Sequence, residues 1–134
     1  MTTLLVAQAA PIDGGALHAR VDALFAALRE QGRRAVRIVD LDCGTGRRIR
    51  RVARRARALG FVSVEARGCA RGGREAAAAT RAGAARPDPA VGFQFDATDP
   101  DAALLEERDD ADLVIAQKRL APISDRSRSG RSRA

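Results

Sequence analysis

The hydrophobic positions follow a helical period in two stretches of this chain. Apolar residues recur at i, i+4, i+7, i+8 and i+11 in the first stretch and predict an amphipathic helix that ends at Gly32: Leu17, Val21, Leu24, Phe25 and Leu28. Pro11 to Gly15 predict a loop before it. A second set predicts a helix from Arg47 to Leu59: Ile49, Val52, Ala53, Ala56 and Leu59.

Four short apolar runs predict β-strands. They are residues 38–41, 61–66, 91–95 and 111–116, and in 91–95 Val91, Phe93 and Phe95 alternate with smaller or polar residues. Two shorter helices are expected between them, an alanine-rich one within residues 72–83 and another over residues 101–107. Strands that alternate with helices predict an α/β domain with a parallel sheet.

Composition limits the domain to a small one with a thin core. The chain has 134 residues, the size of one small domain, and its hydrophobic fraction of 46% is mostly Ala, Val and Leu, with no Trp or Tyr. No stretch is long enough to cross a membrane, and residues 1–10 lack the basic start of a signal peptide. Cys43 and Cys69 have neither metal-site spacing nor disulfide density, so we expect no metal and a cytoplasmic location.

Charge is unevenly distributed along the chain. The net charge is +7, and the helix from Arg47 to Leu59 carries seven arginines. This helix could bind RNA phosphates, but no aromatic residue is interleaved to stack bases, so a solvated face or a compositional bias of the genome is the favoured explanation. Acids dominate from Asp99 to Asp112, and we expect them to attract the basic middle of the chain. His18 lies beside an apolar stripe, as a surface residue rather than a catalytic base.

A strand, a glycine turn and a helix follow one another at residues 38–59, an order that exposes backbone N–H groups. The turn lacks the Gly-Lys-Ser/Thr of a Walker loop, and Ile49 stands where a dinucleotide fingerprint needs a small residue. The run from Ile38 to Gly46 resembles motif I of the class I S-adenosylmethionine-dependent methyltransferases. An ordinary βα turn without a ligand is the simpler alternative.

Several residues match that family's motif. Asp40 matches its acid, Cys43 its cysteine, and Gly44 and Gly46 its second and third glycines, whereas Asp42 stands where the first glycine is usual. The resemblance implies that Asp40, Gly44 and Gly46 bind the methionine part of S-adenosylmethionine. Cys43 is expected to be a packing residue whose backbone lies near the ligand, and Asp42 puts a charge beside the cofactor's own carboxylate.

The resemblance also extends to the later strands. Asp96 and Ala97 follow the strand 91–95 and match the family's adenine-binding loop, although Asp96 or Asp99 could instead cap the next helix. The family's ribose-binding acid falls at Gly68, where no carboxylate exists, and Glu65 is the nearest acid. The turn after the fourth strand lacks the family's Asn/Asp-Pro-Pro-aromatic motif, so no catalytic residue can be assigned.

The resemblance implies a Rossmann-like three-layer sandwich over residues 16–123, with about four parallel strands in the order 3-2-1-4 and helices on both faces. Residues 1–15 are an N-terminal segment and residues 124–134 a disordered basic Ser/Arg tail. The family's fifth to seventh strands are missing, so the strand from Asp112 to Ala116 would be an open apolar edge. We expect that edge to pair with a second copy or another chain, or to be covered by residues 117–123.

Three functions are consistent with the sequence. The first is a truncated S-adenosylmethionine-binding methyltransferase homologue, with an unknown methyl acceptor and activity that depends on a partner or is lost. The second is a non-catalytic basic α/β module that binds RNA or a protein through the helix from Arg47 to Arg57 and the C-terminal tail. The third is a retained fold that binds no ligand, because Asp42 and Gly68 depart from the family at cofactor contacts.

Overall fold

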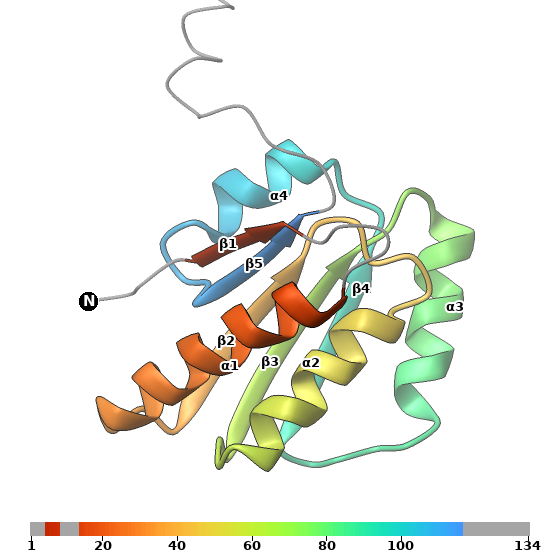
Figure 1. The fold of residues 1–134 in the computed structure, drawn as a ribbon. Helices are drawn as coiled ribbons and strands as arrows, with labels where there is room; N and C mark the ends of the chain where they lie inside the picture. Colours follow the sequence, from red (N-terminus) through yellow and green to blue (C-terminus); the bar gives the residue numbers. More distant parts are fainter. Residues whose placement is uncertain (1–4, 9–13, 117–134) are drawn as a thin grey trace, which may run out of the picture.

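The structure, a computed structural model, describes residues 5–8 and 14–116 (Figure 1). Strands and helices alternate along the chain. They are β1 Leu5–Gln8, α1 Gly14–Glu30, β2 Ala35–Asp40, α2 Arg47–Ala58, β3 Ser63–Cys69, α3 Gly73–Ala84, β4 Val91–Asp96, α4 Pro100–Glu107 and β5 Leu113–Ala116. Within the described ranges, no helix has the length and apolar character needed to span a membrane.

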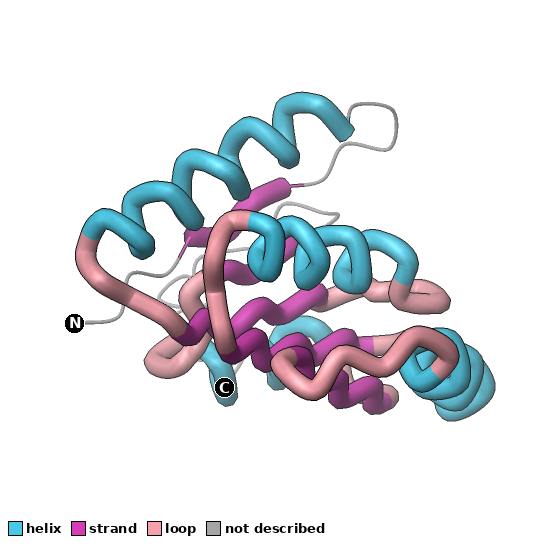
Figure 2. Tube along the Cα trace, turned by 90° about the horizontal axis from the view of Figure 1, so that it is seen from below, coloured by secondary structure: helices cyan, strands magenta, loops and turns pink. Residues whose placement is uncertain are grey.

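The sheet has five parallel strands in the order β1-β5-β2-β3-β4. Strands β4, β3, β2 and β5 reproduce the predicted order 3-2-1-4, so the predicted Rossmann-like α/β fold is confirmed. Helices α1 and α2 lie over one face, α3 lies beside β4, and α4 lies over the opposite face (Figures 1 and 2). Strands β2, β3 and β5 therefore bury one side-chain set under α1 and α2 and another under α4.

The larger core lies under α1 and α2. Alternate residues of β2 and β3 pack there, including Ile38 and Val64, together with Phe25 and Phe61, whose rings meet edge to face at 5.4 Å between centroids. The smaller core, under α4, is built around Val39, Cys69 and Val114. Phe61 precedes β3 rather than starting it, because its N–H donates to Ala56 O where α2 ends, and β3 continues to Cys69.

The expected open edge at β5 does not exist, which corrects our prediction. Strand β1 pairs with β5 in parallel register from Leu5–Leu113 to Gln8–Ala116, while β5 pairs with β2 on its other side. The same chain therefore supplies the missing neighbour, and the edge gives no reason for a homodimer or a partner strand there. The proposed cover from residues 117–123 and the basic tail lie outside the described residues.

The acidic run lies on α4, on the face of the sheet opposite α2 (Figure 1). Ion pairs join Glu106 and Glu107 to arginines of the strands, and Asp112 to Arg33 after α1. The predicted attraction between these acids and the basic middle of the chain is therefore confirmed for Arg37 and Arg67 of the strands. It is wrong for the arginines of α2, because the sheet separates the acids from that helix.

Candidate functional site

A cavity of about 590 Å³ opens where four strands end, at the carboxyl edge of the sheet. The segments after β2, β3 and β4 line it together with the end of β5. Its lining residues include Leu41, Asp42, Cys69, Ala70, Arg71, Ala97, Thr98 and Asp99. Ligands of open α/β sheets bind outside the carboxyl ends of the strands, where the strand order reverses, and here that point lies between β2 and β5.

The glycine turn between β2 and α2 follows the part of the cavity wall that Leu41 and Asp42 form, and Cys43, Gly44 and Gly46 are not among the lining residues. Gly44 and Gly46 have φ values of +56° and +85°, a conformation that other residues adopt at a cost. Cys43 N–H donates to Cys69 O at 3.0 Å, which fixes the turn against the end of β3. Gly46 precedes α2, and no side chain caps the first turn of that helix. The turn therefore has the open backbone that the motif predicts.

Asp40 is completely buried at the end of β2. Arg48 donates to both of its carboxylate oxygens, from Nε at 3.0 Å and from Nη2 at 2.8 Å, and Asp42 N–H donates to Oδ1 at 3.1 Å. Burial raises the pKa of Asp40, and the hydrogen bonds from Arg48 oppose that rise. Asp40 thus stabilises the turn through its bonds to Arg48 and Asp42 N–H, and it is not among the residues that line the cavity.

Asp42 faces the cavity, with Arg71 beside it. Arg71 Nη2 lies 3.3 Å from Asp42 Oδ2, and the two side chains are 76% and 23% exposed. An ion pair this exposed contributes at most about 1 kcal/mol, so a ligand can displace it at low cost. Asp42, the residue that departs from the motif, and Arg71 therefore place one carboxylate and one guanidinium at the mouth of the cavity.

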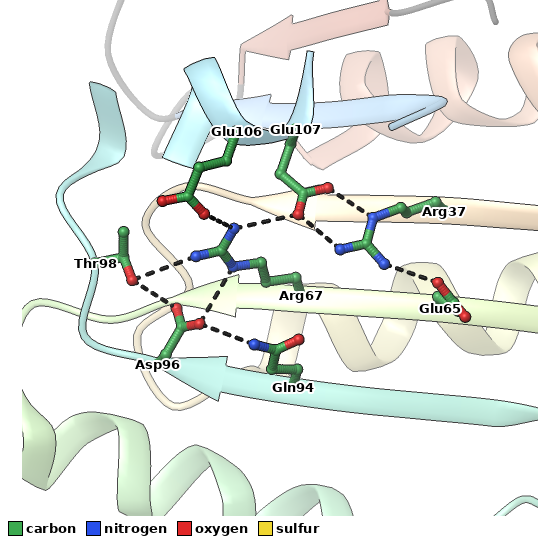
Figure 3. Close-up of polar contacts among 8 residues, drawn as sticks. All are labelled: Arg37, Glu65, Arg67, Gln94, Asp96, Thr98, Glu106 and Glu107. Carbon is green, nitrogen blue, oxygen red and sulfur yellow. Dashed lines mark hydrogen bonds and ion pairs between the residues drawn. The ribbon is translucent and has the colours of Figure 1, made fainter. Parts of the chain in front are cut away.

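Asp96 lies at the end of β4 but points to the α4 side of the sheet (Figure 3). Thr98 Oγ1 donates to it at 3.0 Å and Gln94 Nε2 at 3.2 Å, and Arg67 Nε lies 3.3 Å away. Ala97, the next residue, lines the cavity. Of the two candidates for the N-cap of α4, Asp96 and Asp99, the structure shows that Asp99 is the cap, because it accepts from the N–H groups of Asp101 and Ala102.

Gly68, to which we assigned the family's ribose-binding position, is not among the residues that line the cavity. It lies inside β3, paired with Asp40 and Phe95, and the strand ends one residue later. The residues of this segment that line the cavity are Cys69, Ala70 and Arg71, and none carries a carboxylate. The nearest acid in the sequence, Glu65, lies farther back in the strand and pairs with Arg37.

A network of charges links the sheet to α4, and sequence reasoning missed it (Figure 3). Glu107 accepts from Arg37 Nε and Nη2, both at 2.6 Å, and from Arg67 Nη1 at 3.2 Å, while Glu106 accepts from Arg67 at 2.8 Å. Arg67 and Glu107 are 6% and 5% exposed. Arg37 in β2 and Arg67 in β3 could have indicated this network from the sequence, because arginines inside otherwise apolar strands need buried partners.

The environment of the two cysteines disfavours their thiolate forms at neutral pH. Both are buried, and burial raises the pKa of Cys43 to about 12 and that of Cys69 to about 11. Cys43 packs with Ala70 and Ala76, as a packing residue. In the part of the chain that the structure describes, no group of three or more His, Cys, Asp or Glu side chains could hold a metal ion. His18 is exposed on α1.

Comparison of the chain with protein-family models, with curated proteins and with solved structures found no match. The functional argument therefore rests on the fold and on the residues around the cavity.

Proposed function

We propose that this chain binds S-adenosylmethionine in the cavity at the carboxyl edge of its sheet. The observation that carries the proposal is the position of that cavity at the carboxyl edge of the sheet. It lies between Leu41 and Asp42, which precede the glycine turn, and the Ala97–Thr98–Asp99 loop after β4. Its volume of about 590 Å³ lies within the usual range for small-molecule sites, roughly 300–1,000 Å³.

The lining residues fit the ligand in charge and hydrogen bonding, with one departure. The Asp42 carboxylate would accept from the ligand's ammonium group, and Arg71 would pair with its carboxylate. The loop after β4 would flank the adenine. The residues after β3 that line the cavity carry no carboxylate for the ribose, so we expect weaker binding than a carboxylate there would give.

The bound cofactor would supply an electrophilic methyl group to a nucleophile on an acceptor. In the proposed site the protein's part is to hold the sulfonium in line with that nucleophile, which proximity and orientation alone can accelerate. Asp42, Arg71 and the glycine turn would fix the ligand's orientation. We assign no general base, because the buried cysteines are protonated and Asp40 is occupied by Arg48.

The test is isothermal titration of the purified chain with S-adenosylmethionine and S-adenosylhomocysteine. Asp40 is a poor target for mutation because its loss would disturb the fold, so we choose Ala97→Trp, which fills the cavity from an exposed position. Ala77→Trp, exposed on α3 and outside the cavity lining, is the matched control.

The proposal predicts micromolar binding to the wild type and to A77W, and none to A97W. Absence of heat up to millimolar ligand would overturn it, as would tighter binding of NAD or ATP at the same site. Equal binding to A97W and A77W would place the ligand elsewhere.

A further inference from the structure

The arginines of α2 divide into two groups. Arg48, Arg55 and Arg57 pair with Asp40, Asp22 and Asp88. Three others are exposed and have no hydrogen-bond or ion-pair partner within residues 5–8 and 14–116: Arg47, Arg51 and Arg54. Arg50 donates only to a backbone carbonyl, Gly46 O, at 3.1 Å. Four of the seven arginines of this helix are therefore available to an external anion.

The available arginines form a stripe beside a groove. Arg47, Arg50, Arg51 and Arg54 recur at helical spacing and span about 10 Å of helix at 1.5 Å per residue. The groove, with a volume of about 210 Å³, lies between α2 and the end of α3, and Arg50 and Arg54 border it on one side and Arg86 on the other. We call this stripe and groove together the basic groove.

An aromatic side chain contributes to the floor of the basic groove. Phe93 lines it together with Val91, Ala53 and Gly83, and its ring stacks on Phe95 at 5.6 Å between centroids. Phe93 is partly exposed and comes from β4, far from α2 in sequence. The tertiary structure thus supplies an aromatic residue beside the arginines, although none is interleaved with them along the chain.

The distribution of acids leaves the basic groove positive. The acidic run lies on the opposite face of the sheet, where Glu106 and Glu107 pair with strand arginines. Asp88 borders the groove, and Asp22 lines an adjoining cavity with Arg51 and Arg54. Each of these acids already accepts from an arginine, Asp88 from Arg57 and Asp22 from Arg55. Such a one-sided field attracts a polyanion.

We infer that the basic groove binds the backbone of a single-stranded nucleic acid, with phosphates on Arg47, Arg51 and Arg54 and one base against Phe93. Cations that follow a backbone beside an aromatic side chain are the usual means of single-strand binding. An anionic membrane fits less well, because the large apolar residues of α2, Ile49 and Val52, are buried and leave no bulky apolar side chain to insert. The inference is independent of cofactor binding.

The test is fluorescence anisotropy of the full chain with labelled oligouridine and oligodeoxythymidine of about 15 nucleotides, and with a duplex of equal length, over a series of salt concentrations. The variant is Arg51→Gln with Arg54→Gln. Its control is Arg34→Gln with Arg108→Gln, which removes the same charge from exposed arginines outside the groove. Circular dichroism checks that both variants remain folded.

The groove variant should bind either strand at least roughly tenfold more weakly at low salt, and its log–log salt slope should fall in magnitude by about 1.4, or 0.7 for each lost phosphate contact. The control should change affinity far less. Phe93→Leu should weaken single-strand binding by about fivefold or more and leave duplex binding unchanged. Whichever oligonucleotide binds more tightly, oligouridine or oligodeoxythymidine, shows whether the groove prefers RNA or DNA.

Equal losses in the groove variant and its control would overturn the inference, because binding would then follow net charge or the basic tail. Tighter binding of the duplex, or binding only to vesicles that contain phosphatidylserine, would also overturn it. Because Ala97→Trp leaves the groove intact, it should not alter oligonucleotide binding, which separates this result from that of the cofactor test.

Discussion

Arg48 donates to both carboxylate oxygens of Asp40, at 3.0 and 2.8 Å, across the glycine turn between β2 and α2. Arg48 Nη2 also donates to Asp42 O at 3.1 Å, so the same guanidinium holds the backbone of the turn. The acid of the motif is therefore engaged within the protein, and the cavity receives its charges from Asp42 and Arg71 instead.

Arg48→Met should lower the free energy of unfolding by about 3 kcal/mol at neutral pH, because it leaves the buried Asp40 carboxylate without its cation. Burial raises the pKa of this carboxyl in the folded state, so protonation as the pH falls favours the folded form. The deficit of the variant should therefore shrink on acidification. Urea unfolding at neutral and acid pH measures it. A deficit that stays constant with pH would contradict this role for Arg48.

Gly68→Ala should destabilise the protein by about 1–3 kcal/mol, because the new Cβ would lie 2.6 Å from the Phe95 ring and 2.9 Å from Cys43 Cβ. Gly92→Ala, in the neighbouring strand, is the control, since its Cβ would have no heavy atom within 4 Å. Thermal and urea unfolding compare the two. The addition of Phe95→Leu should recover part of the loss in the first variant. Equal stability of G68A and G92A would show that this contact relaxes freely.

Glu107→Gln should lower the free energy of unfolding by about 3 kcal/mol at neutral pH, because Arg37 and Arg67 lose their shared buried carboxylate. The hydrogen bonds from Arg37 hold the pKa of Glu107 below its ordinary value of 4.5. Its stabilisation is thus complete above about pH 4.5 and is lost as the pH falls through the lower folded-state pKa.

The difference between wild type and E107Q should therefore disappear in acid, as urea unfolding across that range would measure. Glu30→Gln, exposed at the end of α1, is the charge-matched control and should change little at any pH. A wild-type advantage that persists in strong acid would show that the side chain stabilises by packing rather than by charge.

The pairing of β1 with β5 predicts slow amide exchange across β5 in a monomeric protein, because the strand has neighbours on both sides. Deletion of residues 1–8 should expose the apolar β5 edge, speed this exchange and promote dimers or aggregates. Hydrogen exchange by mass spectrometry and light scattering measure the two effects. Fast exchange throughout β5 in the full chain would contradict the pairing.

Local sequence was sufficient for most elements of the fold. The apolar period of α1 and α2, the alternation in β4 and the glycine turn each predict an element that the structure contains. The edge strand β1 was missed because four residues carry too little periodicity to separate a strand from a loop. The start of β3 was placed too early because Phe61 is apolar for a different reason, its burial against Phe25.

The candidate site was predicted only in part, because sequence gives a residue's position in a strand more readily than its partner. Asp42 and Ala97 line the cavity as residues that follow strand ends. Asp40 and Asp96 lie at those ends, but their side chains bond to Arg48 and to Thr98. Which arginine reaches which carboxylate depends on contacts between residues distant in the chain.

By itself the sequence determined the order of helices and strands, the parallel sheet and the position of the glycine turn, because these depend on the spacing of apolar residues and on backbone freedom within short segments. Only the tertiary structure decided where the charges act. The sheet separates the acids of α4 from the arginines of α2, and it brings Phe93 to the groove beside them. Such juxtapositions follow from how the elements pack, which no local pattern of residues specifies.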